Sequence, residues 1–118
     1  ACSPKPAATF AERAAQAQAL ENTPVGMAYI TDVLKEHGES INRFAGECYA
    51  GSPLKKDTFT LVADIDPQGN FENVDVQPDS APTRCYALKI DKLQVKANRP
   101  VGYSDKPFPL VFNFNYNK

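Results

Sequence analysis

The stretch Phe108-Pro-Leu-Val-Phe-Asn-Phe-Asn-Tyr116 shows the most regular pattern in the chain. Every second residue is large and apolar, and the residues between them include Val111 and the asparagines Asn113 and Asn115. A period of two residues is typical of a strand with one buried and one exposed face. We therefore predict a strand from Phe108 to Tyr116, with an apolar side made of Phe108, Leu110, Phe112, Phe114 and Tyr116.

A second alternating stretch, Thr58 to Asp66, precedes this strand and predicts a hairpin. Its apolar residues fall on one face, which consists of Phe59, Leu61, Ala63 and Ile65. Asp66-Pro-Gln-Gly-Asn70 comes next, and this composition favours a turn in which Gly69 adopts a positive φ. The return strand is expected from Phe71 to Gln77.

Residues 9–48 are predicted to be helical. Thr9 and Glu12 have the spacing of a capping box, and Thr23 with Pro24 suits the start of a second helix. Gly38 is expected to break or bend that helix. Its buried stripe is predicted to be Met27, Ile30, Val33, Leu34, Ile41, Phe44 and Ala45. A short helix is also expected from Arg84 to Leu93.

Length and composition favour one α+β domain over residues 9–118. The chain has 118 residues, of which 42% are hydrophobic and 23% charged, as in ordinary globular domains. No window approaches the roughly 20 apolar residues of a membrane helix. The net charge of −1 gives no broad attraction to phosphate backbones, which argues against nucleic acid as a partner.

The first eight residues, Ala-Cys-Ser-Pro-Lys-Pro-Ala-Ala, are expected to be a flexible tether. Ala1-Cys2-Ser3 resembles the end of a bacterial lipoprotein signal, in which Cys2 would carry acyl chains. Ser3 after the cysteine would then favour the outer membrane. The alternative is that Ala1 is a remnant of cleavage or cloning and Cys2 an unpaired thiol.

Several features follow one another along the second half of the chain: Glu47-Cys-Tyr, Ser52-Pro-Leu, Phe59–Asp66, Gly69, Asn73-Val74, Cys85, Ile90 and the phenylalanine-rich end. In this order they resemble the TonB C-terminal-like domains. The likeness is greatest to the AgmX/PglI-type branch and covers about residues 46–116. Leu93-Gln-Val stands where the family usually has tryptophan and phenylalanine. The resemblance implies β-β-α-β order over residues 54–118, with helices covering one face of a three-stranded antiparallel sheet.

In the TonB family, partner peptides add a strand to the sheet edge near the C-terminus. The resemblance therefore implies that Phe108 to Tyr116 is a partner-binding edge, with Asn113, Asn115 and Asn117 on the solvent side. A homodimer through the same strand is a second option. The alternative is an ordinary terminal strand, protected by Pro107, Pro109 and nearby lysines.

Cysteines also distinguish that branch, which often has one before the first strand and one at the start of the second helix. Cys48 and Cys85 occupy those places and flank the hairpin, and in an oxidising periplasm we expect them to form a disulfide. Neither lies in a Cys-x-x-Cys motif, so a structural bond is favoured over redox catalysis.

The remaining polar residues predict no catalytic, metal or cofactor site. His37 is the only histidine, and we expect it to be solvated at a charged helix end. Asp64, Asp66 and Asp75 lack the spacing of a calcium loop. Lys89, Lys92, Lys96 and Arg99 form a basic row at helical spacing. Contact with anionic lipid or peptidoglycan is one interpretation of this row, and a solvated face is the favoured one.

These features predict a non-enzymatic binding or adaptor protein of the cell envelope, in the periplasm and anchored through Cys2. Its partner would be an envelope protein or peptide. The alternative function is a periplasmic inhibitor or immunity-type protein that blocks a toxin or hydrolase. A hydrolase that uses His37 is the weakest hypothesis.

Overall fold

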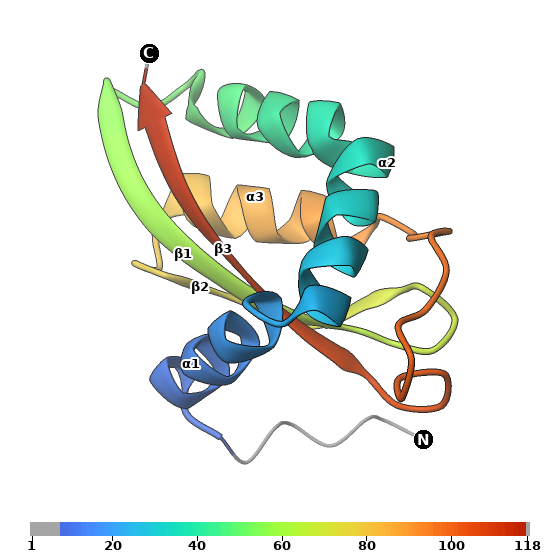
Figure 1. Ribbon diagram of the computed structural model, residues 1–118. Coiled ribbons are helices and arrows are strands. Elements are labelled where there is room, and N and C mark those ends of the chain that lie inside the picture. Colours follow the sequence, from blue (N-terminus) through green and yellow to red (C-terminus); the bar gives the residue numbers. More distant parts are fainter. Residues whose placement is uncertain (1–7, 118) are drawn as a thin grey trace, which may run out of the picture.

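The computed structural model describes residues 8–117, which form three helices and one three-stranded antiparallel sheet (Figure 1). The elements are α1 (Phe10–Glu21), α2 (Pro24–Tyr49), β1 (Lys56–Ile65), β2 (Phe71–Gln77), α3 (Ala81–Asp91) and β3 (Phe108–Asn117). The strand order is β2-β1-β3, so β1 is the central strand. The predicted α+β class and the β-β-α-β order that follows the helical region are confirmed.

The helix starts follow from local capping. The Thr9 side chain accepts a hydrogen bond from the Glu12 N–H, and the Glu12 carboxylate accepts one from the Thr9 N–H, both at 3.1 Å. These hydrogen bonds with Thr9 hold the pKa of the Glu12 carboxyl below its usual value. Ser80 and Thr83 form a similar box, so α3 begins at Ala81, earlier than predicted.

Helix α2 is unbroken through Gly38, so of the two predicted alternatives the break is wrong. The helix changes direction along its length instead (Figure 1). The predicted buried stripe of α2 also included residues that are not buried. Ile30, Val33, Ile41 and Ala45 are buried and Phe44 is partly buried, but Met27 and Leu34 are 56% and 44% exposed.

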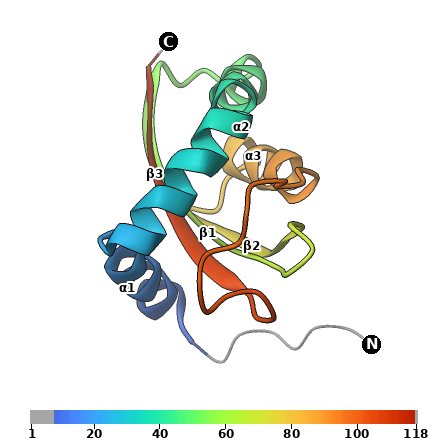
Figure 2. The same ribbon diagram turned by 45° about the vertical axis from the view of Figure 1, so that its right-hand side comes forward.

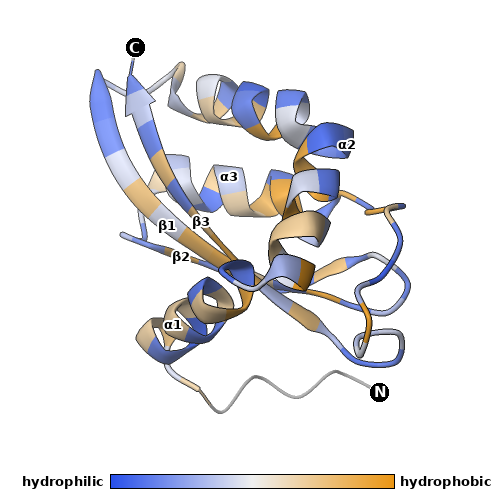
Figure 3. Cartoon of the chain, viewed as in Figure 1, coloured by the Kyte–Doolittle hydropathy of each residue, from blue (hydrophilic) through white to orange (hydrophobic). Residues whose placement is uncertain are grey.

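The main core lies between the sheet and helices α2 and α3. The predicted inward face of β1 is confirmed, since Phe59, Leu61, Ala63 and Ile65 are each at most 3% exposed. Five aromatic rings are in contact in this core. Tyr49, Phe59, Phe114 and Tyr116 form stacked pairs, and Tyr86 meets Phe59 edge to face. Figure 3 shows hydrophobic residues along the middle of β1 and β3, while the ends near the C-terminus are hydrophilic.

The sequence predicted helices on one face of the sheet, which α2 and α3 cover. The structure adds α1, which covers part of the opposite face. Ala17 of α1 packs against Val62 of β1 and Val111 of β3, and all three side chains are buried. Arg13 extends this contact, because its guanidinium donates to the Asn73 carbonyl at 2.7 Å. Figure 2 shows α1 near the foot of α2.

The long segment between α3 and β3 is fixed against α2. The Glu36 carboxylate accepts the backbone N–H groups of Lys96 and Ala97 at 2.8–3.1 Å. The Arg99 guanidinium donates to the carbonyls of Tyr103 and Lys106 at 3.0 and 2.7 Å. Hydrogen bonds that involve charged groups are the stronger ones, so these contacts tie the connection to α2.

Candidate peptide-binding edge and its groove

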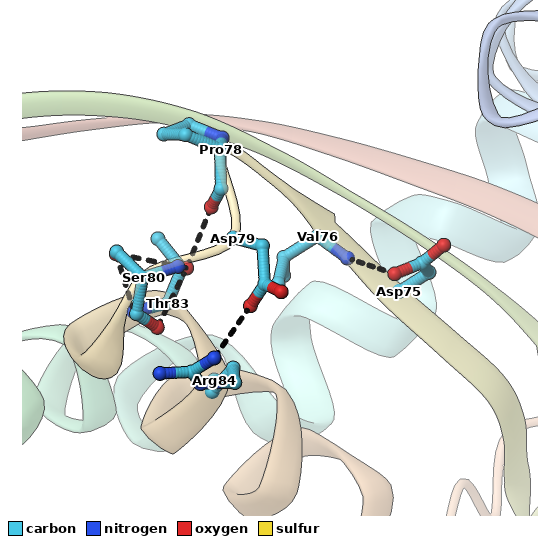
Figure 4. A network of polar contacts seen from close by, with 7 residues as sticks. All are labelled: Asp75, Val76, Pro78, Asp79, Ser80, Thr83 and Arg84. Atoms are coloured by element: carbon cyan, nitrogen blue, oxygen red, sulfur yellow. Dashed lines mark hydrogen bonds and ion pairs between the residues drawn. The ribbon is translucent and has the colours of Figure 1, made fainter.

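The two edge strands of the sheet differ in how well their outer sides are protected. β2 has seven residues, its pairing with β1 is interrupted by an irregularity opposite Val62–Asp64, and Pro78 follows its end. The Asp75 carboxylate also accepts the Val76 N–H at 2.9 Å (Figure 4). Bulges, proline and charged side chains are the usual means of blocking an edge. The outer side of β2 is therefore blocked.

β3 presents a longer and more regular edge. It has ten residues, and its register with β1 is unbroken from Lys56↔Asn117 to Ile65↔Phe108. Proline within a sheet points its N side away from its partner strand, so Pro109 marks an outward-facing position. Alternation then places the outward backbone groups on Val111, Asn113 and Asn115.

The bond made by Asp75 gives the same assignment independently. Val76 is opposite Leu61 in the β1–β2 pairing, and its N–H points away from β1 toward the Asp75 carboxylate. The N–H and C=O of Leu61 must then face β3, where Leu61 pairs with Phe112. Phe112 is thus bonded to β1, and its neighbours Val111 and Asn113 direct their N–H and C=O groups outward.

A groove of about 410 Å³ lies along this outward edge. One wall comes from α2, whose Ile30, Leu34 and Ile41 are apolar, and the floor comes from residues 111–114 of β3. Gln18 and Glu21 of α1 and Asn42 of α2 supply polar atoms at the rim. The groove therefore combines outward strand backbone with an apolar wall on one side and a polar wall on the other.

Leu34 explains why the predicted core stripe of α2 was too wide. It lines the groove while 44% of its surface stays exposed. Met27 lies seven residues earlier, on the same face of the helix, and is 56% exposed. Among residues 8–117, no strand lies beyond β3 to cover that side of α2.

The predicted edge residues are placed as follows. Phe108, Leu110 and Val111 are buried and anchor the first half of β3. Phe112, Phe114 and Tyr116 are partly buried against the core, and Asn113, Asn115 and Asn117 are exposed, as predicted. The Thr60 hydroxyl donates to the Asn113 side-chain carbonyl at 2.9 Å, which fixes that amide across the strand pair.

The predicted disulfide is confirmed. Cys48 in the last turn of α2 and Cys85 in α3 are bonded, with Cα atoms 5.7 Å apart and a separation of 37 residues. The bond joins the helix that walls the β3 groove to the helix beside β2. Cys2 lies outside the described residues, as does most of the predicted tether.

His37 lies within α2 and is not the solvated residue at a helix end that the sequence predicted. Its side chain is 17% exposed, and Nε2 lies 2.6 Å from the Gln94 carbonyl oxygen and 3.1 Å from Glu36. Both of these neighbours are acceptors, so Nε2 carries the hydrogen and donates it. His37 helps to hold the segment before β3.

The other polar residues singled out in the sequence have structural contacts. Asp64 lies 3.7 Å from the Arg13 guanidinium, and Asp66 accepts the N–H groups of Gln68 and Asn70 in the hairpin turn. The predicted basic row is not a helical row, since α3 ends at Asp91. Within residues 8–117 no group of three or more histidine, cysteine or acidic residues is placed to hold a metal ion.

Sequence patterns alone missed the α1 and α2 walls of the groove. Gln18 and Glu21 carry no special motif, and Leu34 has the spacing of an ordinary core residue. One signal was available in the sequence: the predicted apolar stripe of α2 is wide. Met27 and Leu34 extend this stripe beyond the residues that pack against the sheet and α3.

Comparisons with protein-family models, curated proteins and solved structures found no match for this chain. The TonB-like resemblance therefore stays a prediction. No described helix is long and apolar enough to cross a membrane.

Proposed function

We propose that this chain is a non-enzymatic protein-binding module that takes an extended peptide segment as a fourth strand on β3. The observation that carries the proposal is the regular outward edge at Val111, Asn113 and Asn115, next to the partly exposed Leu34. Strand addition supplies main-chain hydrogen bonds, and pockets for alternate side chains supply specificity.

The groove walls define the pattern of the bound segment. Side chains of an added strand alternate between the two faces of the sheet. Those on the α2 side would meet Ile30, Leu34 and Ile41, and those on the α1 side would meet Gln18 and Glu21. The proposed partner is therefore a segment that alternates apolar residues with polar or basic ones.

The proposed location is the periplasm, where acyl chains on Cys2 would anchor the protein to the outer membrane. Structural disulfides are typical of oxidising compartments such as the periplasm, and the Cys48–Cys85 bond supports that location. Ala1-Cys2-Ser3 supports the anchor through its resemblance to a lipoprotein signal. In this role the module would hold an envelope protein or peptide near the membrane.

The test begins with decapeptides selected from a random library on the immobilised, disulfide-bonded chain. Binders should share the alternating pattern, and in ¹⁵N-labelled protein they should shift the amide signals of residues 111–115 and of α2. A selection that yields no binder, or binders that shift only other regions, contradicts the proposal.

Two matched pairs of variants identify the contacts. Asn113→Pro removes the outward N–H, whereas Asn113→Ala also removes the side chain but keeps that donor. Binding should weaken about two- to tenfold in the first variant, because a lost hydrogen bond costs about 0.5–1.5 kcal/mol, and by less than about twofold in the second. Equal affinity of the proline and alanine variants would refute strand addition.

The second pair concerns the apolar wall. Leu34→Lys places a charge in the groove, and Val25→Lys places one at a similarly exposed site of α2, since the two residues are 44% and 45% exposed. Only Leu34→Lys should weaken binding. The same edge could pair two copies of the chain, in which case Asn113→Pro would also shift the oligomeric state measured by sedimentation equilibrium.

A further inference from the structure

A second groove, of about 490 Å³, lies at the other edge of the sheet, between β2 and α3. We call it the α3 groove. Its apolar surface comes from Val74 and Val76 of β2 and from Ala87 and Leu88 of α3, and its rim carries Asp75, Asp79, Arg84 and Asp91. Leu88 is 65% exposed, although α3 buries Tyr86 and Ile90 on its other side. The groove thus presents a large apolar side chain in an acidic surrounding.

The charges at this rim are unbalanced. Arg84 lies 3.4 Å from Asp79, and both are well exposed, so this pair is largely neutral (Figure 4). Asp75 and Asp91 have no ion-pair partner among residues 8–117. Lys89 of α3 is paired with Glu47 of α2, 3.9 Å away. Two carboxylates therefore flank the apolar surface without an ion-pair partner, because Arg84, the cation at this rim, lies against Asp79.

The blocked edge of β2 limits the kind of segment that can dock here. The Val76 N–H is already bonded to Asp75 Oδ1, as Figure 4 shows, and Pro78 follows the end of the strand. A strand added at this edge would find the outward Val76 N–H of β2 already bonded. A docked segment must then use side chains alone, and a helix, which satisfies its own backbone groups, does so at the lowest cost.

We infer that the α3 groove binds a cationic amphipathic helix of a partner protein. Apolar residues on one face of that helix cover Leu88, Ala87 and Val74, and lysine or arginine residues at its margins reach the carboxylates of Asp75 and Asp91. The groove and the β3 edge lie at opposite edges of the sheet, so the module can hold two partners at once. The inference does not depend on strand addition at β3.

The test uses a designed 16-residue peptide with blocked ends, in which leucines recur at three-to-four spacing and lysines flank them. A control peptide has glutamate in place of every lysine. Both are titrated into the full ¹⁵N-labelled, disulfide-bonded chain at low salt and again at 0.5 M NaCl. The cationic peptide should cause saturable shifts in residues 74–77 and 84–91, while residues 111–115 stay unchanged. Its affinity should fall at high salt, because exposed charges are screened beyond a few ångströms there.

Two variants with matched controls complete the test. Leu88→Gln should abolish detectable binding, whereas Leu54→Gln, at an exposed leucine outside the groove, should not change it. Combined Asp75→Asn and Asp91→Asn should weaken binding roughly five- to tenfold and reduce its salt dependence, while Glu39→Gln should do neither. All these side chains are well exposed, and circular dichroism verifies that each variant folds.

Three results would overturn the inference. The first is an anionic control peptide that binds as tightly as the cationic one, because charge selects the partner in this proposal. The second is a shift map confined to β3, which would place the peptide in the other groove. The third is an affinity that Leu88→Gln leaves unchanged.

Discussion

Replacement of both Cys48 and Cys85 by alanine tests how much the cross-link between α2 and α3 stabilises the fold. The disulfide closes a loop with a sequence separation of 37 residues. The chain-entropy relation gives about 4 kcal/mol of stabilisation for a loop of this length. Both cysteines are only partly buried, so the substitution itself removes little apolar contact. A domain of this size loses roughly 4 °C of melting temperature per kcal/mol, which predicts a decrease of about 15 °C.

The assay is urea unfolding followed by circular dichroism, together with a thermal scan. The wild-type protein with reductant should match the double variant, and the double variant should not respond to reductant. This comparison separates the cross-link from the side chains that replace it. A loss of less than about 1 kcal/mol in the free energy of unfolding would refute the loop-closure reasoning.

Three further predictions concern stability. Gly69→Ala should destabilise the fold by at least about 2 kcal/mol more than Gly102→Ala, measured by urea unfolding. Both glycines have a positive φ, at 89° and 87°. A Cβ at Gly69 would lie 2.0 Å from the Val95 carbonyl oxygen, whereas a Cβ at Gly102 would meet nothing within 4 Å. Tyr86→Phe should leave stability unchanged or raise it by about 1 kcal/mol, because the Tyr86 hydroxyl is buried without a hydrogen-bond partner among the described residues; a loss above 1 kcal/mol in the same assay would contradict this. Burial raises the pKa of the Tyr49 hydroxyl, and its hydrogen bond to the Asp57 carboxylate adds to this effect. The stability that this hydroxyl contributes is therefore complete below the unfolded tyrosine pKa of about 10 and is lost as the pH rises through the higher folded value. Tyr49→Phe should make the alkaline decrease in the free energy of unfolding shallower.

Much of the fold could be predicted because its signals are local. The period of two residues in Phe108–Tyr116 located β3, and the turn signal at Asp66–Asn70 located the return strand β2, both almost to the residue. The spacing of Thr9 and Glu12 located the start of α1, since a capping box needs only four consecutive residues. Errors arose where a local signal was incomplete. At Ser80 the cap is completed by threonine, and at Gly38 tertiary packing outweighs the weak helix preference of one glycine.

The candidate site was predicted only in part. Its strand followed from the alternating pattern, and the exposed positions of Asn113 and Asn115 followed from the same period. The groove beside that strand depends on residues far apart in the sequence, because Gln18, Leu34 and Phe112 meet only after three elements have packed. No spacing rule relates such residues.

The sequence by itself determined which elements form, their order and most of the residues that face inward, because hydrophobic period and capping act within a few residues. Only the tertiary structure decided that β1 is central, that α1 packs on Val62 and Val111, and that Leu34 stays exposed beside β3. These outcomes depend on which surfaces compete for the same apolar side chains once the chain is compact. The open edge of the sheet is a consequence of that competition, and so is the function proposed for it.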